Sequence, residues 1–449
     1  MNQSLYLVAG LGKTGFSIAG YLHRRNQPFV VFDTRREVEG LAEFITEFPG
    51  VDVFLGELPA TLYKQLTGII TSPGIALDEP FLQEAFRLKI PVFGDIECLA
   101  REVQAPVIAI TGTNGKSTVT TLVGEMAKAA GLTVAVAGNI GLPVLDLLDD
   151  GKRYDLWVLE LSSFQLDLLH SLKPVAATIL NISPDHLDRH HSLAAYVNSK
   201  QHIYQDAQYL LYNREDKLTL PAKKAADNQT PVLVSYGLDK PALGAWGIVE
   251  QAGLHYLAQG NNLLMPTDKL RIKGKHNWQN ALAACALAEA AGIKSQHMIS
   301  VLESFSGLPH RCQWVRTLHE VDWINDSKGT NIGATISAIS GIGGSIEGKI
   351  VLIAGGVGKG ADFSELRPAV AEHVRSAVLI GKDADKIETG LAKTVPVLSA
   401  STLEDAVKLA KLQARPGDVV LLSPACASYD MFRDFNHRGE SFAALVGHL

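Results

Sequence analysis

The segment IAITGTNGKST, residues 108–118, contains residue types that could hold a nucleotide phosphate. Gly115, Lys116 and Ser117 match the end of the phosphate-loop pattern G-x-x-x-x-G-K-[ST]. The position of the first glycine in that pattern is occupied by Ile110, and the nearest glycine is Gly112. The apolar run before the loop predicts a strand, and the apolar spacing of STVTTLVGEMAKAAG predicts a helix after it. This is the context that a phosphate-binding loop requires.

In such a loop, the backbone N–H groups of Gly112, Asn114 and Gly115 would face the phosphates. The Lys116 ammonium would reach the β- and γ-phosphates, and the Ser117 hydroxyl would ligate Mg²⁺. A plain strand-to-helix turn has little reason to carry lysine and serine there. We therefore favour a phosphate loop with a shortened spacing.

Two polar stretches downstream could complete a metal site. Glu160 ends the apolar run of YDLWVLELSSFQL, where a carboxylate could hold the metal of a phosphate loop; capping of the next helix is the alternative. His186 lies in NISPDHLDRHHS beside Asp185 and Asp188. Most of that loop is expected to be solvated, with at least one residue near a second metal.

The N-terminus carries a second nucleotide motif. Gly10, Gly12 and Gly15 follow a predicted strand and open a predicted helix, and Asp33 ends the next strand 18 residues after Gly15. Glycines at this spacing let a diphosphate approach a helix N-terminus. An NAD-type dehydrogenase, a turn that needs glycine only for packing, and a nucleotide-sugar diphosphate site are all compatible with this motif.

The order of predicted elements indicates an α/β protein with three consecutive domains. Short apolar runs alternate with helical stretches in three series, which is typical of open, mostly parallel sheets. We predict a Rossmann-like N-terminal domain, a central ATPase-like domain with the phosphate loop, and a Rossmann-like C-terminal domain. Their predicted ranges are 1–94, 95–303 and 304–449. Residues 207–272 are less regular and are expected to form short strands of the central domain.

Composition narrows the class of protein further. The chain has 449 residues, a net charge of -6 and four widely spaced cysteines. That charge offers no diffuse basic field for nucleic acid or an anionic membrane, and isolated cysteines fit a reducing compartment. The N-terminus lacks the features of a signal peptide, and the Ala-rich stretch ALAACALAEAAG is too short to span a membrane. We expect a cytoplasmic protein.

Taken together, the motifs resemble those of the Mur ligases of peptidoglycan synthesis. The matching segments occur in order across all three predicted domains: TGTNGKST, GNIG, ELSSFQL, NISPDHLDRH, GKHNWQNALAA, LPHR, NDSKGTN and LLSPACASYDMFRDFNHRGESF. The early segments also occur in folylpolyglutamate synthetases. The run SPACASYDMFRDF resembles the Mur ligases that add D-glutamate.

The resemblance implies that the short ATP loop is normal for the family and that the N-terminal glycine turn faces a UDP-sugar diphosphate, not NAD. The residues that match UDP-substrate contacts are Lys13, Thr14, Asp33, Thr34, Arg35, Ser72, Pro73, Gly74, Asn139 and His186. Those that match ATP contacts are Gly112, Thr113, Asn114, Gly115, Lys116, Ser117, Thr118, Asn277, Asn280, Arg311, Asp326 and Lys328.

The same resemblance assigns the remaining site residues. Those that match D-glutamate contacts are Thr330, Lys359, Ser428 and Phe435. Those that match metal ligands are Ser117, Glu160, His186 and Lys200, the last as an N-carboxylated lysine or carbamate. Those expected to be catalytic are Lys116, Glu160, His186, Lys200 and Arg311. The sequence departs from many relatives at Gly358 and at Tyr429, where some relatives have an aliphatic residue.

The implied reaction is ATP-dependent formation of an amide between UDP-N-acetylmuramoyl-L-alanine and D-glutamate through an acyl phosphate. It implies ATP, two Mg²⁺ ions, a carbamylated Lys200 and a monomeric protein. The alternatives are another Mur or folylpolyglutamate-type ligase, a dehydrogenase, a GTPase-like switch, or a non-catalytic binder of a UDP-sugar or NAD.

Overall fold

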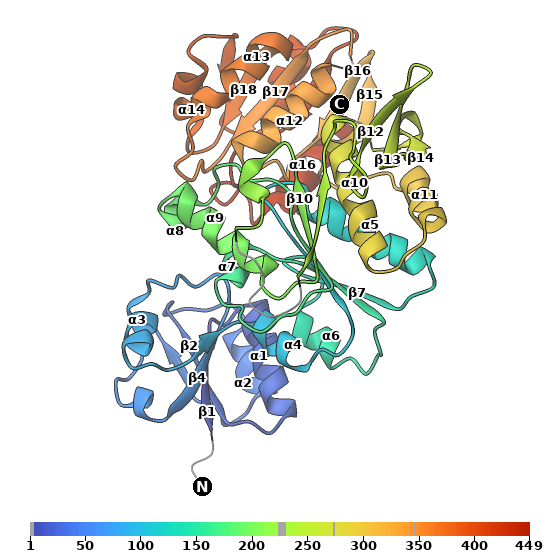
Figure 1. The fold of residues 1–449 in the computed structure, drawn as a ribbon. Helices are drawn as coiled ribbons and strands as arrows, with labels where there is room; N and C mark the ends of the chain where they lie inside the picture. The colour runs from blue at the N-terminus through green and yellow to red at the C-terminus, as the bar shows by residue number, and fades with distance from the viewer. Residues whose placement is uncertain (1–3, 223–229, 273, 345) are drawn as a thin grey trace.

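The computed structural model describes residues 4–222, 230–272, 274–344 and 346–449. The chain forms three β-sheets in sequence order, each flanked by helices (Figure 1). This confirms the predicted α/β class with three consecutive sheets. Among the described residues, no helix combines the length and the hydrophobicity that crossing a bilayer requires.

The first sheet has five parallel strands in the order β3-β2-β1-β4-β5. Its elements are β1 (Leu5–Ala9), α1 (Lys13–Arg24), β2 (Phe29–Asp33), α2 (Leu41–Glu47), β3 (Val53–Leu55), η1 (Leu62–Lys64), β4 (Leu66–Thr71), α3 (Pro80–Arg87) and β5 (Val92–Phe93). The carboxyl ends of parallel strands share one edge. The loops after β1, β2 and β4, which carry the predicted UDP-substrate residues, therefore lie at the same edge.

The second sheet has nine strands in the order β14-β13-β12-β11-β10-β9-β6-β8-β7. Its first half comprises α4 (Asp95–Glu102), β6 (Val107–Thr111), α5 (Lys116–Ala129), β7 (Val134–Gly138), α6 (Val144–Leu148), β8 (Leu156–Glu160), α7 (Ser163–Leu166), β9 (Ala176–Ile179), α8 (Leu187–His190), α9 (Leu193–Gln201) and η2 (His202–Tyr204). Strands β6, β8 and β9 are parallel neighbours, so the phosphate loop and Glu160 lie at one edge.

The predicted short strands of residues 207–272 extend this sheet. The elements are β10 (Tyr209–Asn213), η3 (Lys217–Thr219), β11 (Val232–Tyr236), β12 (Trp246–Gln251), β13 (Leu254–Gln259), β14 (Asn262–Pro266) and η4 (Thr267–Lys269). Strands β12, β13 and β14 form an antiparallel meander at the sheet's edge. Residues 223–229 of this segment lie outside the described residues. Two helices follow, α10 (Lys275–Ala290) and α11 (Ser295–Ser304).

The third sheet has six strands in the order β15-β16-β20-β17-β18-β19. Its elements are β15 (Gln313–Leu318), β16 (Val321–Asn325), α12 (Ile332–Gly343), β17 (Ile350–Gly355), η5 (Phe363–Leu366), α13 (Arg367–His373), β18 (Val374–Ile380), α14 (Ala384–Leu391), β19 (Val397–Ser399), α15 (Leu403–Gln413), β20 (Val419–Leu422) and α16 (Phe435–Gly447). In the sequence, the apolar runs VDWINDS, KIVLIAGG, SAVLIG and DVVLLSPA predict the four inner strands, but the edge strands β15 and β19 were not predicted. Neither strand is fully buried, so neither shows the continuous apolar run of a central strand.

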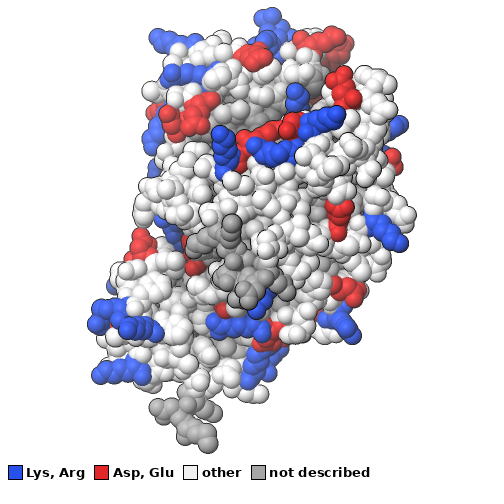
Figure 2. All heavy atoms as spheres, viewed as in Figure 1, with Lys and Arg blue, Asp and Glu red and all other residues white. Residues whose placement is uncertain are grey.

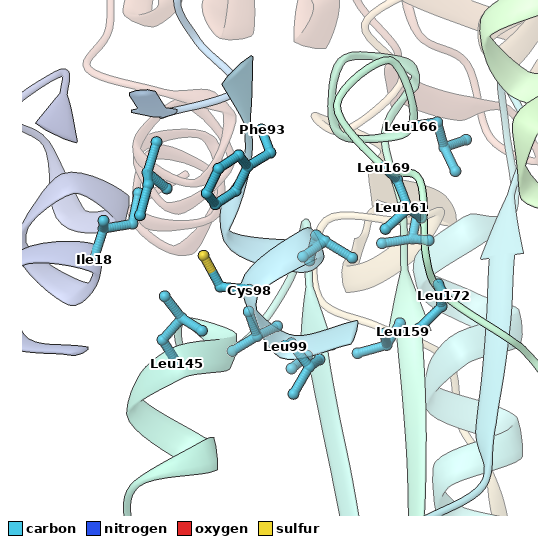
Figure 3. Packing of buried hydrophobic residues seen from close by; sticks show 14 of the residues in the cluster. Ile18, Phe93, Cys98, Leu99, Leu145, Leu159, Leu161, Leu166, Leu169 and Leu172 are labelled. Atoms are coloured by element: carbon cyan, nitrogen blue, oxygen red, sulfur yellow. The ribbon is translucent and has the colours of Figure 1, made fainter. Parts of the chain in front are cut away.

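The hydrophobic core is continuous between the first two sheets. One buried cluster combines Ile18 of α1 with Cys98 and Leu99 of α4 and with Leu159 of the second sheet. Figure 3 shows Cys98 and Leu99 between Ile18 on one side and Leu159 on the other. In contrast, the buried clusters around the third sheet consist only of residues from the C-terminal part. The first two sheets are thus joined by apolar packing that the third sheet does not share.

We predict that Leu99→Ala lowers the free energy of unfolding by roughly 2–5 kcal/mol, because it opens a cavity in a fully buried cluster. The measurement is denaturant unfolding of the full chain. Leu412→Ala is the control, since Leu412 is 78% exposed and its truncation should change stability by less than about 0.5 kcal/mol. Equal effects of the two variants would contradict a shared core at α4.

Candidate nucleotide and substrate site

The phosphate loop joins β6 to α5, and its conformation depends on glycine. Gly115 has a φ of +83° directly before the first helical residue, Lys116. A Cβ at Gly115 would lie 2.5 Å from the Asn280 Oδ1 atom, so any larger residue would collide with α10. The Lys116 ammonium donates hydrogen bonds to the Gly112 and Thr113 carbonyls, at 2.9 and 2.8 Å. Lys116 therefore lies over the cradle that the sequence predicted.

One detail of the predicted cradle is wrong. The Asn114 N–H does not face the phosphate position, because it donates to the Asn181 Oδ1 atom at 2.8 Å. The Asn181 amide also donates to the Asn114 carbonyl at 3.0 Å, and its own carbonyl accepts from the Thr113 N–H at 2.8 Å. Asn181 braces the loop and was missed by sequence reasoning. Its signal is an asparagine two residues after the end of β9, in the segment NISPDH.

The Ser117 hydroxyl connects the loop to residues that are distant in sequence. It accepts hydrogen bonds from Arg311 Nη2 at 3.1 Å and from Lys328 Nζ at 3.0 Å. Ser117 also helps to hold the pKa of the nearby Glu160 carboxylate below its ordinary value. The structure thus brings three of the predicted ATP and metal residues, Arg311, Lys328 and Glu160, to the side chain of Ser117.

Glu160 ends β8 and is 1% exposed. Its Oε1 atom accepts from Asn139 Nδ2 at 2.8 Å, while Oε2 is buried without a hydrogen-bond partner. Burial raises the pKa of Glu160, but Lys116, Asn139 and Lys328 outweigh it and hold that pKa below its ordinary value. A buried, ionised carboxylate with one oxygen unpaired fits a cation, and Mg²⁺ commonly takes one or two carboxylates beside phosphate and water. The described residues contain no cluster of three His, Cys, Asp or Glu for another kind of metal site.

Lys200 lies in the stretch AAYVNSKQHIY, whose apolar spacing predicts a helix. The structure places Lys200 in α9, where it is 1% exposed. Its ammonium donates to Thr111 Oγ1 at 3.1 Å and to the Gly112 carbonyl at 2.9 Å. Burial, together with the nearby Lys116, holds the pKa of Lys200 well below its ordinary value. Lys200 is therefore a buried amine at the base of the phosphate loop and not a solvated surface lysine.

His186 is placed beside the same edge by a left-handed backbone conformation, with a φ of +52°. Burial lowers its pKa to about 4, so its imidazole is neutral near pH 7. Its Nε2 atom lies 3.8 Å from Asp185 Oδ2, and its ring lies edge-on to Phe164 with 5.2 Å between the ring centres. A neutral imidazole can donate to a ligand or coordinate a metal.

A cavity of about 310 Å³ opens beside the phosphate loop. Of the predicted ATP residues, it is lined by Asn114, Gly115, Thr118, Asn277, Asn280, Arg311, Asp326 and Lys328. Sequence reasoning missed its apolar and aromatic walls, Leu180, Tyr236 and Ile272. Burial raises the pKa of Asp326 to about 6 and lowers that of Lys328 to about 8. The cavity is large enough for part of a nucleotide and combines apolar walls with a few polar groups.

The C-terminal part meets this edge through polar contacts. Lys359 Nζ lies 2.6 Å from Asp185 Oδ1, and Asn331 Nδ2 donates to Asp185 Oδ2 and Asn114 Oδ1, each at 3.2 Å. On the face shown in Figure 2, charged side chains of both signs lie side by side in a band across the upper half of the molecule. Among the predicted D-glutamate residues, Lys359 therefore reaches the central sheet directly.

The other predicted D-glutamate residues lie on loops around the third sheet. Thr330 is half-buried two residues after Lys328, and its N–H donates to the Lys328 carbonyl at 2.9 Å. The Phe435 ring lies 4.8 Å from Lys328 Nζ, and Ser428 is buried. Tyr429, one of the departures, is 76% exposed.

The predicted UDP-substrate residues gather at the edge of the first sheet. Asp33 accepts from the Leu11 N–H at 2.8 Å and forms a two-point ion pair with Arg35. The glycine turn before α1 is thereby tied to the end of β2. Lys13 and Thr14 begin α1, Thr34 follows Asp33, and Ser72 of the segment Ser72-Pro73-Gly74 has a buried hydroxyl with no hydrogen-bond partner. Asn139 and His186 lie on the central sheet instead.

We predict that Asp185→Asn loosens the C-terminal part in the ligand-free protein, because the variant removes the charge that pairs with the half-buried Lys359 ammonium. The measurement is the radius of gyration from small-angle X-ray scattering, which should increase. Lys408→Ala is the control, since it breaks an exposed pair within α15. An unchanged radius for Asp185→Asn would show that this ion pair does not hold the two parts together.

Comparisons with known families place this geometry in context. Three family descriptions match successive parts of the chain: the MurD-like N-terminal domain of Mur ligases at residues 4–94, the Mur ligase middle domain at residues 110–288, and the glutamate ligase domain of Mur ligases at residues 310–426. Together they span each of the three sheets.

Individual relatives agree with these matches. The chain is 66% identical over 447 residues to a UDP-N-acetylmuramoylalanine–D-glutamate ligase of Legionella pneumophila strain Paris, with 99% of each chain covered. It is 48% identical over 443 residues to the ligase of the same name from Pseudomonas aeruginosa, covering 99% of this chain and 98% of that one. Solved structures share the fold, including a pseudomurein peptide ligase from Methanothermus fervidus (TM-score 0.61, 19% identity, 99% of each chain). From its sequence and its fold, the chain belongs to the Mur ligase family.

Proposed function

We propose that this protein is an ATP-dependent amide ligase that joins D-glutamate to UDP-N-acetylmuramoyl-L-alanine. The observation that carries the proposal is the 66% identity, over 99% of both chains, to a ligase named for this reaction. The site supports it, because the phosphate loop, Glu160, Lys200 and Lys359 approach one sheet edge from four segments of the chain. We assign the domains as residues 1–94, 95–303 and 304–449, and we place the reaction in the cytoplasm.

ATP is proposed to lie in the 310 Å³ cavity, with its phosphates over the loop from Gly112 to Thr118. The Lys116 and Lys328 ammonium groups and the Arg311 guanidinium would exchange their present oxygen partners for phosphate oxygens. A buried cation gains most from an anionic partner, because the surrounding protein screens charge weakly. Asn277 and Asn280 are proposed to contact the adenine and Asp326 the ribose.

The described residues fit a Mg²⁺ ion beside the phosphates. Glu160 offers a buried carboxylate oxygen without a partner, and Ser117 offers a hydroxyl close enough to affect the pKa of that carboxylate. When bound, the ion would neutralise phosphate charge and align the γ-phosphoryl group. We propose that His186 and a carbamylated Lys200 serve a second ion.

The electrostatics of Lys200 support the proposed carbamylation. An ammonium is a poor neighbour for a divalent cation, whereas a neutral amine can attack CO₂, form an N–C bond and lose a proton. Burial lowers the pKa of Lys200 and so favours the neutral amine that reacts with CO₂. The product carries a negative charge and two oxygen atoms that suit Mg²⁺.

The proposed reaction has two steps. An alanyl carboxylate oxygen attacks the γ-phosphorus, and the bond to ADP breaks to leave an acyl phosphate. The neutral amine of D-glutamate then attacks the acyl carbon, phosphate leaves, and the amine loses a proton as the amide forms. Both steps build up negative charge, which Lys116, Arg311 and Lys328 are positioned to stabilise.

Substrate placement follows the three sheets. The UDP group is proposed to bind at the edge of the first sheet, with Asp33, Thr34 and Arg35 near the uridine. Lys13, Thr14 and the segment 72–74 are proposed to contact the diphosphate, and Asn139 and His186 the muramoyl peptide. D-Glutamate is proposed to bind Thr330, Lys359, Ser428 and Phe435 after its carboxylate replaces Asp185 at Lys359. The protein is proposed to act as a monomer.

The alternative functions do not explain every group in this site. A dehydrogenase or a passive UDP-sugar binder has no need of a phosphate loop facing a buried glutamate and a buried lysine. Another Mur or folylpolyglutamate-type ligase would share the central site and differ in the amino acid it accepts.

The primary test measures phosphate release from ATP with each substrate omitted in turn. We expect turnover only when UDP-N-acetylmuramoyl-L-alanine and D-glutamate are both present. L-Glutamate, L-alanine and a folate acceptor serve as controls for the sister ligases. Equal turnover with L-glutamate or L-alanine would remove the D-glutamate assignment, and ATP hydrolysis without any amine would favour the nucleotide-switch alternative.

We predict that Lys200→Ala reduces kcat by roughly 100-fold or more, because it removes a charged group from the phosphoryl-transfer site. Acetate or formate should partly restore activity by supplying a carboxylate in the vacated space. Carbon-13 bicarbonate should give a carbamate signal in the NMR spectrum of the native protein that the variant lacks. Lys128→Ala, which alters an exposed lysine of α5, is the control. Near-normal turnover of Lys200→Ala would exclude this role.

A further inference from the structure

Arg189 of α8 reaches from the central sheet into the first domain. Its Nη1 atom donates to the Gly74 carbonyl at 3.0 Å, and its Nη2 atom donates to the carbonyls of Pro73, at 3.4 Å, and Ile75. One guanidinium thus holds three successive carbonyls of the segment 72–75. Only arginine presents several N–H donors in a rigid, planar fork of this kind.

The segment 72–75 lies beside the glycine turn that is proposed to bind the diphosphate. The Ser72 N–H donates to the Ala9 carbonyl at 2.9 Å, and a Cβ on Gly10 would lie 2.9 Å from the Ser72 hydroxyl. That hydroxyl is buried and has no hydrogen-bond partner in the structure. An unpaired buried hydroxyl next to a glycine turn is suited to contact a ligand oxygen.

Side-chain contacts also connect Arg189 to the surroundings of His186 and Lys200. Its guanidinium lies 4.6 Å from the centre of the Phe164 ring. Phe164 in turn lies edge-on to His186 and stacks on His190, with 5.2 Å between ring centres in each case. The His190 Nδ1 atom lies 3.4 Å from the hydroxyl of Ser199, the residue before Lys200. Packed side chains therefore connect the segment 72–75 to the surroundings of both His186 and Lys200.

Arg189 lies near several carboxylates but pairs with none of them at close range. Within the described ranges it forms no ion pair at 4.0 Å or less, and its hydrogen bonds go to the three carbonyls of the segment 72–75. Burial lowers the pKa of Arg189, and the more distant Asp78, Asp167, Asp188 and Glu79 offset part of that effect. The contact between Arg189 and the segment 72–75 therefore consists of hydrogen bonds to carbonyls, not of an ion pair.

The docking of the two domains does not depend on Arg189. The apolar cluster around Cys98 and Leu99 joins the first two sheets, and Arg25 pairs with Glu102 and Asp149 across the same boundary. His191 of the loop after α8 lies 3.9 Å from Asp78. Removal of Arg189 should therefore free the segment 72–75 without separating the domains.

We propose that Arg189 is a positioning residue for the UDP-linked substrate. It fixes the segment 72–75 at a set distance from His186 and Lys200, so that a diphosphate held there presents the acyl carboxylate to the phosphate loop. This inference rests on the proposed function, and it adds a residue of the central domain to the binding of a substrate whose nucleotide lies on the first domain.

The test compares Arg189→Ala, Arg189→Lys and the control Arg87→Ala, which breaks an exposed pair with Glu84 in α3. For each variant, KM is measured for the three substrates, together with kcat. Loss of hydrogen bonds to a charged group should raise the KM for the UDP-linked substrate about tenfold or more in Arg189→Ala. The KM values for ATP and D-glutamate should stay within about twofold, because Arg189 does not contact their proposed sites.

Two further readouts separate positioning from general stability. Arg189→Lys keeps the positive charge and most of the packing but lacks the planar set of N–H donors that contacts three carbonyls. The KM for the UDP-linked substrate should therefore also rise in this variant. Added ethylguanidinium should lower that KM in Arg189→Ala, while ethylammonium should not. Arg87→Ala should match the native enzyme in every parameter.

The outcomes distinguish this inference from the proposed function. If the native protein shows no turnover with UDP-N-acetylmuramoyl-L-alanine, ATP and D-glutamate, the proposed function fails. If the native protein is active, the inference is overturned by a native KM for the UDP-linked substrate in Arg189→Ala. It is equally overturned by a parallel rise in all three KM values with a lowered melting temperature, or by Arg189→Lys behaving as native.

Discussion

The burial of several cations beside one carboxylate is the constraint on which this structure depends. Lys116, Lys200, Arg311 and Lys328 approach the carboxyl edge of the central sheet, where Glu160 is buried. Burial lowers the pKa of each of these four cations, and so opposes their charged forms. The neutral carbonyls and the two hydroxyls that they contact compensate this cost only in part. An anionic ligand with several oxygen atoms would satisfy the whole group, which is why phosphate binding follows from the electrostatics as well as from the loop.

The arrangement of the sheets serves this requirement. A buried cation can be held only if its partners are fixed, and the partners here come from the ends of β6, β8 and β9. Parallel pairing places these strand ends together, and the brace from Asn181 holds the loop between them. Arg311 and Lys328 reach the same point from segments about 200 residues away in sequence, as their contacts with Ser117 show. Two of the four cations at this site, Arg311 and Lys328, are therefore placed there by packing between segments that are distant in sequence.

The two boundaries between the domains differ in kind. The first boundary is apolar, and its buried cluster includes residues such as Ile18, Leu99 and Leu159. The second boundary is spanned by side-chain hydrogen bonds and the ion pair between Lys359 and Asp185. Apolar packing is lost as a unit when surfaces separate, whereas polar partners can be exchanged for ligand atoms or water. The N-terminal site is therefore held in a fixed relation to the phosphate loop, while the C-terminal residues can exchange Asp185 for a substrate carboxylate.

The sequence by itself determined the class of fold and most of the central site. Gly115, Lys116, Ser117 and Glu160 are recognisable because glycine permits the turn and an apolar strand precedes each motif, and these are local properties. Local properties also predicted α9 around Lys200 and the strands of the third sheet, except for the half-exposed β15 and β19. The resemblance to a family supplied the remaining contacts.

Only the tertiary structure decided which groups are paired. It placed Asn181 against the Asn114 N–H, left one Glu160 oxygen without a partner, and brought Arg189 to the carbonyls of the segment 72–75. It also buried Lys200, whose sequence context is that of an ordinary surface helix. Hydrogen bonding and burial depend on residues that are distant in the chain, and a single sequence does not show which of those residues lie close together in the fold. For this reason the types of residue in the site followed from the sequence, whereas their partners and pKa values followed from the fold.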